Sequence, residues 1–71
     1  MNWNEYPKVK PPQMEGTYLV TVRECEGVPR FVTEMQYNPG SGWWDEVSEQ
    51  IGFDWNGLVV AWATMPEPYG G

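Results

Sequence analysis

Two stretches of the chain, residues 17–24 and 30–37, alternate between apolar and polar side chains. Successive side chains of a β-strand point to opposite faces of a sheet, so this alternation predicts two half-buried strands. Both stretches are also rich in β-branched and aromatic residues, which suit strands. The residues expected to face the core are Tyr18, Val20 and Val22 in the first strand and Phe31, Thr33, Met35 and Tyr37 in the second.

Turn signals follow each of these strands. Residues 25–29 form a short connection that contains a glycine, which is typical of a β-hairpin loop. Residues 38–42 place Pro39 and Gly40 at the two central positions of a turn, and this pair favours a type II turn. The first two strands are therefore expected to pair, and the chain is expected to reverse again after the second.

Two further strands are predicted in the second half of the chain. Residues 42–46 should form a short strand in which the adjacent Trp43 and Trp44 point to opposite faces, so that one of them is in the core. Residues 58–64 are apolar on both faces, which is typical of a strand inside a sheet or covered on both sides.

The two ends of the chain are predicted to be irregular. Residues 1–16 hold several prolines, which lack an amide hydrogen and restrict the preceding residue, so we expect an extended arm. Trp3 and Tyr6 are expected to pin this arm to the body. Residues 66–71 contain two prolines and glycines and should leave the sheet as an extended tail.

These features predict one mostly β domain over residues 1–71, with little helix. Its centre, residues 17–65, would be a small antiparallel sheet of three to four strands in a meander. Residues 47–56 could be a loop or a short helix, which Gly52 would end quickly. So small a sheet exposes a face, which must be covered by the arm, by the 47–56 segment or by a second copy of the chain.

Aromatic side chains must supply much of the core, because other means of stabilising so short a chain are missing. The 71 residues include one cysteine and no histidine, so neither an intrachain disulfide nor a Cys/His zinc site can form. The five Trp, four Tyr and two Phe can each bury roughly 150–250 Å². Cys25, between Glu24 and Glu26, is expected to be a solvent-near loop residue without a redox role.

The charge is strongly acidic, with ten acidic and four basic residues and a net charge of −6. This balance disfavours nucleic acid, whose phosphates require Lys and Arg, and it disfavours anionic membranes. It permits a basic protein partner, although solubility is a commoner reason for such a charge. The start of the chain lacks the pattern of a signal peptide, and no apolar run approaches the roughly 20 residues of a membrane span. We therefore expect a cytoplasmic protein.

Two stretches of the sequence carry a family resemblance. Tyr6-Pro7 precedes Gly16-Thr17-Tyr18-Leu19-Val20, and Ala61-Trp62-Ala63-Thr64-Met65-Pro66-Glu67-Pro68 closes the chain. This order resembles a small family of unknown function from bacteriophages, prophages and gut bacteria. Its members run from a Trp and a Pro near the start, through Gly-x-Tyr-Leu-Val, to a closing Trp-x-x-Leu-Pro-x-Pro.

The match covers nearly the whole chain, with two departures from the pattern. Met65 stands where the family usually has Leu, and Trp3-Asn4 replaces the usual Trp-Ile opening. The resemblance implies a bacterial or phage setting and a small accessory protein, and it brings no catalytic or binding residues. The closing motif is interpreted structurally: Trp62 packs from a strand, and the two prolines hold the exit chain against it.

No constellation of residues points to catalysis. General acid–base chemistry requires titrating groups held in a cleft, and a chain of this length has little room for one. We therefore expect no enzyme, no metal site and no cofactor. Exposed tryptophans with acidic neighbours would instead form an apolar centre with an acidic rim, a surface suited to a basic protein. The candidate binding residues are Trp43, Trp44, Asp45, Glu46, Glu49 and Trp55, with Asp54 in the same rim.

The leading hypothesis is a protein–protein interaction module. It would be a small acidic accessory protein that binds a host or phage protein, as a phage-encoded modulator or inhibitor of a host factor. One alternative is a self-associating structural β domain, which the apolar strand at 58–64 favours. Another is a binder of small ligands that stacks a sugar or base on Trp43 or Trp44. An oligomer predicts a concentration-dependent mass, and a ligand binder predicts quenching of Trp fluorescence.

Overall fold

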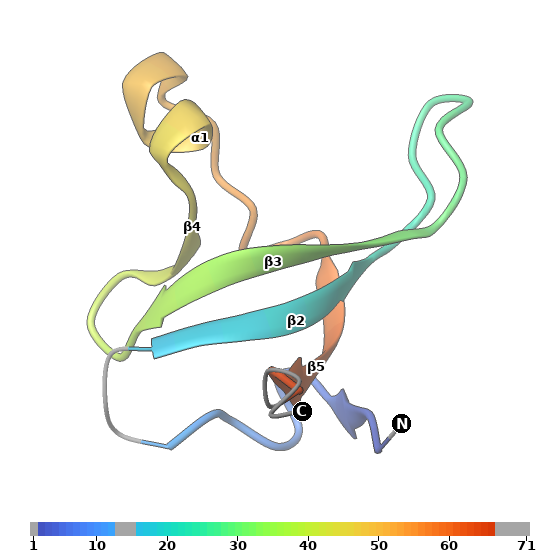
Figure 1. Cartoon of the computed structure of the whole chain (residues 1–71). Coiled ribbons are helices and arrows are strands. Elements are labelled where there is room, and N and C mark those ends of the chain that lie inside the picture. The colour runs from blue at the N-terminus through green and yellow to red at the C-terminus, as the bar shows by residue number, and fades with distance from the viewer. Residues whose placement is uncertain (1, 13–15, 67–71) are drawn as a thin grey trace, which may run out of the picture.

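A computed structural model describes residues 2–12 and 16–66, which form one antiparallel sheet of five strands and a single short helix (Figure 1). The mostly β fold predicted from the sequence is confirmed. The strand order in the sheet is β1-β5-β2-β3-β4. The elements are β1 (Asn4–Glu5), β2 (Gly16–Val22), β3 (Phe31–Asn38), β4 (Gly42–Trp44), α1 (Glu46–Ile51) and β5 (Val59–Thr64).

The strands β2 and β3 form the predicted hairpin and pair along seven residues. Beyond the paired region the chain reverses at Glu26 and Gly27, whose φ angles of 45° and 84° are both left-handed. Two left-handed residues are the mark of a type I′ turn, whose twist matches that of the strands. Hydrogen bonds of 3.0 and 2.8 Å join Cys25 and Val28 across this turn. Cys25 is exposed, as expected.

The turn between β3 and β4 differs from the predicted type II turn. A type II turn requires a positive φ at its second central residue. Gly40 occupies that position without a left-handed φ, whereas Gly42 has a φ of 87°. The Ser41 N–H donates to the Asn38 carbonyl at 3.2 Å, so the loop is closed one residue before the left-handed glycine. Such three-residue loops match the twist of the paired strands. The geometry of the hairpin therefore outweighs the preference of Pro39-Gly40 for a type II turn.

The last strand, β5, does not continue the meander of β2, β3 and β4. It returns to the other side of β2 and lies between β1 and β2, as its apolar character on both faces predicts. Val60 is a bulge, since β2 pairs with Val59 and Ala61 on either side of it. The arm supplies the fifth strand: β1 pairs with β5, and the Tyr6 N–H donates to the Val60 carbonyl at 2.9 Å.

Trp43 holds the centre of the core and is 2% exposed. Its ring lies 5.5 Å from Tyr6, 6.0 Å from Tyr18 and 4.8 Å from Tyr37, measured between ring centroids. Perpendicular and tilted arrangements of this kind are favourable for aromatic pairs. The remaining members of the buried apolar cluster are Val20, Val22, Met35, Val59 and Trp62. The faces predicted for β2 and β3 are therefore confirmed, although Phe31 and Thr33 are only half-buried.

Two segments cover the core face of the sheet. Tyr6 from the arm packs against the buried cluster, as do Trp55 and Leu58 from the segment that joins α1 to β5. Trp62 is also buried, and its indole N–H donates to the Val9 carbonyl at 2.8 Å, which fastens the arm. Of the alternatives left open by the sequence, the arm and the 47–56 segment both contribute. The prediction for Pro68 and the rest of the tail after Pro66 lies outside the described residues.

Replacing Gly42 by Ala should destabilise the fold. The added Cβ would collide with the Asn56 side chain, and the left-handed φ of 87° would strain the new residue. Asn56 also accepts a hydrogen bond from the Trp43 N–H at 2.8 Å, so the collision disturbs the contact beside the central Trp. We expect the free energy of unfolding to fall by roughly 1–3 kcal/mol in urea denaturation.

Gly57→Ala is the matched control for this substitution. No atom lies within 4 Å of a Cβ placed at Gly57, and its φ is not left-handed. Its effect should stay within about 0.5 kcal/mol. Equal effects of the two substitutions would contradict the role assigned to Gly42.

Candidate functional site

The helix α1 is short and has a complete capping arrangement at each end. The Asp45 carboxylate accepts from the Ser48 N–H at 2.7 Å, and the Asp45 N–H donates to the Ser48 hydroxyl oxygen at 3.1 Å. At the other end Gly52 has a left-handed φ of 72° and its N–H donates into the last turn. A helix of this length is not stable by itself, so these caps and its contact with the domain decide where it lies.

The orientation of α1 is the reverse of the usual one. Its buried residue is Ser48, which is 2% exposed, because the capping interaction holds that side chain inward. Val47 and Ile51, four positions apart and thus on one side of the helix, are 67% and 72% exposed. An amphipathic helix normally turns its apolar side to the core. This helix presents it to solvent.

An aromatic pair continues the apolar surface away from α1. Phe53 and Trp55 meet edge to face with ring centroids 4.6 Å apart, and Phe53 is 42% exposed. Two hollows share this pair. The first, of about 240 Å³, includes Val47, Ile51 and Asp45.

The second hollow, of about 270 Å³, lies between the aromatic pair and the β2–β3 hairpin and is lined by Val28, Phe31 and Leu58, with the charged Arg23 and Glu26 at its hairpin end. In Figure 1 the helix and the hairpin loop project on the same side of the sheet. We call the continuous surface formed by Val47, Ile51, Phe53, Trp55, Val28, Phe31 and Leu58 the apolar groove.

Carboxylates border the helix end of the apolar groove. Residues 45–54 contain four acidic side chains and no basic one. Hydrogen bonds from Ser48 lower the pKa of Asp45, and the backbone N–H contributes more than the hydroxyl. The backbone N–H of Asn56 is the largest cause of the lowered pKa of Asp54. These two carboxylates therefore stay charged at neutral and mildly acidic pH. Glu46 and Glu49 are exposed on α1.

The six residues expected to form the site are only partly brought together. Asp45 and Trp55 line the hollow beside α1. The buried Trp43 is part of the core, so its indole is out of reach of a partner. Trp44 is half-buried and pairs with Gln36 on the opposite face of the sheet. The structure therefore leaves Asp45 and Trp55 at the groove. Glu46 and Glu49 are exposed on α1, and Glu46 lines a different hollow with Glu34 and Gln36.

The residues that contribute most exposed apolar surface were not among those expected. Val47, Ile51 and Phe53 are large and apolar, yet the sequence gives no sign that they face outward. The spacing of Val47 and Ile51 places them on one side of a helix if residues 47–51 are helical, but the sequence of residues 47–56 is compatible with either a loop or a short helix. Which side faces the core depends on the Asp45–Ser48 cap and on the position of Trp55.

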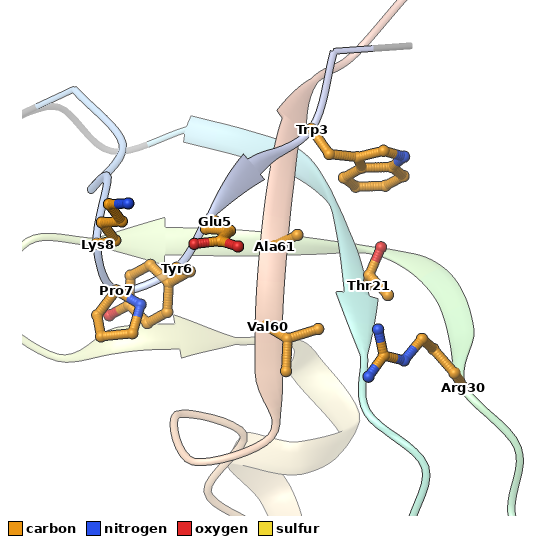
Figure 2. A pocket seen from close by; sticks show the side chains of 9 residues that line it. All are labelled: Trp3, Glu5, Tyr6, Pro7, Lys8, Thr21, Arg30, Val60 and Ala61. Atoms are coloured by element: carbon orange, nitrogen blue, oxygen red, sulfur yellow. The ribbon is translucent and has the colours of Figure 1, made fainter.

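A separate hollow of about 570 Å³ lies at the β1 edge of the sheet (Figure 2). Its lining combines the exposed Trp3 with charged side chains from the arm and from the residue that precedes β3. The lining residues are Trp3, Glu5, Tyr6, Pro7, Lys8, Thr21, Arg30, Val60 and Ala61. None of these residues lines the apolar groove.

Within residues 2–12 and 16–66, no group of three or more His, Cys, Asp or Glu side chains is placed to hold a metal ion. In the same part of the chain no helix is long and apolar enough to cross a lipid bilayer.

Removing the cap of α1 should loosen the groove. Asp45→Ala deletes the acceptor for the Ser48 N–H, and loss of an N-cap costs about 1 kcal/mol. Asp45→Asn keeps an acceptor and should retain most of the stability. Amide hydrogen exchange at Ser48, together with urea denaturation, measures the effect. Unchanged exchange in Asp45→Ala would contradict the cap.

The charge of Asp45 should also give a pH dependence. Its pKa is lower in the folded chain than its ordinary value of 3.8. Such a group stabilises the fold fully above its unfolded pKa and loses that contribution as the pH falls through the folded pKa. The difference in unfolding free energy between wild type and Asp45→Asn should therefore be constant above about pH 5 and shift against the wild type below about pH 4. Urea denaturation of both proteins across this pH range tests the direction of the shift. The two proteins differ only at residue 45, so the effects of the other carboxylates cancel in the difference.

Comparison with known proteins gives this chain no relative. A scan against protein-family models, a search of curated proteins and a search of solved structures each found no match. The resemblance to the small phage and gut-bacterial family therefore stays a prediction.

Proposed function

We propose that this chain is a protein–protein interaction module whose apolar groove binds a basic, partly apolar segment of another protein. The observation that carries the proposal is the outward orientation of α1, which exposes Val47 and Ile51 beside Phe53. Contiguous apolar surface with a polar border is characteristic of protein interaction sites.

The apolar residues would supply affinity. Complete burial of a side chain such as Val, Ile or Phe is worth roughly 1.5–3 kcal/mol. Two hollows on either side of the Phe53–Trp55 pair give a partner's side chains concave places to enter. Anchors that fill such pockets usually dominate the energy of an interface.

The acidic border would select the partner. Asp45, Glu46, Glu49 and Asp54 contribute four negative charges within the same segment as Val47, Ile51 and Phe53, and Asp45 lines the hollow itself. Arg23 and Glu26 line the hollow beside the hairpin and offset each other in charge. Complementary charges accelerate encounter and disfavour wrong partners, while exposed charge pairs add little affinity. A partner segment with Lys or Arg beside its apolar anchors fits this arrangement.

A second copy of the chain fits the same surface less well. A two-fold dimer places identical patches against each other, so the four carboxylates of one copy would face those of the other. This repulsion argues against the self-associating alternative at this surface. The narrower idea of a phage-encoded modulator or inhibitor of a host factor, acting in the cytoplasm, is part of the proposal and rests on the sequence resemblance alone.

Two matched synthetic peptides test the proposal. Both carry the same apolar residues on one side of a helix, and one has Lys and the other Glu on the remaining side. We expect calorimetric titration to show binding of the Lys peptide, weaker binding at high salt, and no binding of the Glu peptide. The double variant Val47→Ser/Ile51→Ser should weaken binding of the Lys peptide at least about tenfold, a loss of roughly 1.4 kcal/mol.

Val32→Ser serves as the control, because Val32 is also exposed, at 55%, but lies on β3 outside the apolar groove. It should leave binding unchanged. Equal binding of the two peptides, or equal effects of the control and the double variant, would reject the proposal. A dimer found by sedimentation that Val47→Ser/Ile51→Ser dissociates would assign the groove to a second copy instead.

A further inference from the structure

The hollow at the β1 edge has the composition of a small-ligand site, and it is independent of the apolar groove. Its volume of about 570 Å³ lies within the range of roughly 300–1,000 Å³ common for ligand pockets. Its residues come from the arm, from β2, from the residue that precedes β3 and from β5 (Figure 2). Four segments far apart in the sequence thus converge on one surface.

Small side chains make the surface concave. Val60 and Ala61 of β5 form the floor, and larger side chains stand around them (Figure 2). The walls are fixed by the backbone, because Glu5 pairs with Ala61 and the Tyr6 N–H donates to the Val60 carbonyl at 2.9 Å. The hollow is therefore built into the pairing of β1 with β5.

Two of the few basic side chains of this acidic chain gather at the hollow. The chain has four basic residues and a net charge of −6, yet two of the four, Lys8 and Arg30, line the hollow with one acid, Glu5. Figure 2 shows the Arg30 guanidinium pointing toward Val60. Because Glu24 pairs with Arg30 and Glu5 also lines the hollow, an anionic group of a ligand would find N–H donors here but no net positive charge.

Glu24 orients the Arg30 side chain for such a role. Arg30 Nε donates to Glu24 Oε2 at 3.1 Å and Nη2 donates to Oε1 at 3.4 Å. This two-point contact favours one plane for the guanidinium at an exposed ion pair, in which the Arg30 and Glu24 side chains are 56% and 63% exposed, and leaves Nη1 outside the pair. Guanidinium groups bind phosphate through several N–H donors in one plane. The Thr21 hydroxyl lines the same end of the hollow.

Trp3 supplies a flat apolar surface next to these polar groups. Its side chain is 39% exposed, and Figure 2 shows the indole above Thr21 at the rim of the hollow. Exposed indoles stack readily on nucleobases, because every base has a flat π face. The Glu5 carboxylate, which lies between Lys8 and Ala61 in Figure 2, can accept hydrogen bonds from sugar hydroxyls, as acidic residues do with ribose.

We infer that this hollow binds a nucleoside monophosphate, with the base on Trp3, the phosphate at Arg30 and Thr21, and the ribose hydroxyls at Glu5. The three parts of such a ligand match the three chemistries that the hollow brings together. The hollow shares no lining residue with the groove, so this site does not depend on the polypeptide partner proposed there.

Titration with AMP, adenosine and ribose 5-phosphate, followed by NMR of the tryptophan indole N–H signals, tests the inference. We expect AMP to shift the Trp3 signal and to bind at least about tenfold more tightly than either fragment, since each fragment lacks one of the two end contacts. Trp3→Ala and Arg30→Gln should each weaken AMP binding about tenfold. Ala61→Leu, which fills the floor with an outward side chain, should abolish it.

Arg23→Gln is the matched control, because it removes the same charge from a residue that lines the other surface. It should change AMP binding by no more than about twofold. Equal losses in Arg23→Gln and Arg30→Gln would show unspecific attraction and overturn the site. Equal affinities for AMP and its fragments, AMP binding unaffected by Ala61→Leu, or no shift of the Trp3 signal at millimolar AMP would also overturn it. Dispersed amide spectra verify that each variant is folded.

Discussion

The packing of aromatic rings around Trp43 is the interaction on which the rest of the structure depends. Its indole contacts Tyr6 of the arm, Tyr18 of β2 and Tyr37 of β3. A chain of 71 residues with one cysteine has no disulfide to join distant segments, so large rings must do so. The position of the arm follows from this packing, and the arm in turn forms β1 and one wall of the hollow at the sheet edge.

The small size of the core also explains why the apolar groove is exposed. The small core is filled by rings from the sheet and the arm, and the segment after β4 contributes Trp55 and Leu58 to it. The helix α1 is left outside this core, with Ser48 turned inward and its apolar side chains in solvent. Because burial of these side chains would stabilise the domain, their exposure is consistent with a surface that is completed by a partner.

The two proposed sites lie on different residues and differ in charge. The groove joins apolar side chains to a segment with four acids and no base and has Arg23 and Glu26 at its hairpin end, whereas Lys8 and Arg30 of the hollow are balanced by Glu5 and by Glu24, the partner of Arg30. The first arrangement suits a basic polypeptide and the second a small anion with a flat ring.

The sequence by itself determined the strands and their faces. Alternation identified β2 and β3 and the inward side of Tyr18, Val20 and Met35, because the period of two is a local property of the backbone. The tertiary structure alone decided that β5 lies beside β2, that the arm adds β1, and that Trp43 rather than Trp44 enters the core. It also decided which side of α1 faces outward and that Trp3 meets Arg30 at one hollow. These outcomes depend on contacts between segments far apart in the chain, and no local pattern of residues encodes such contacts.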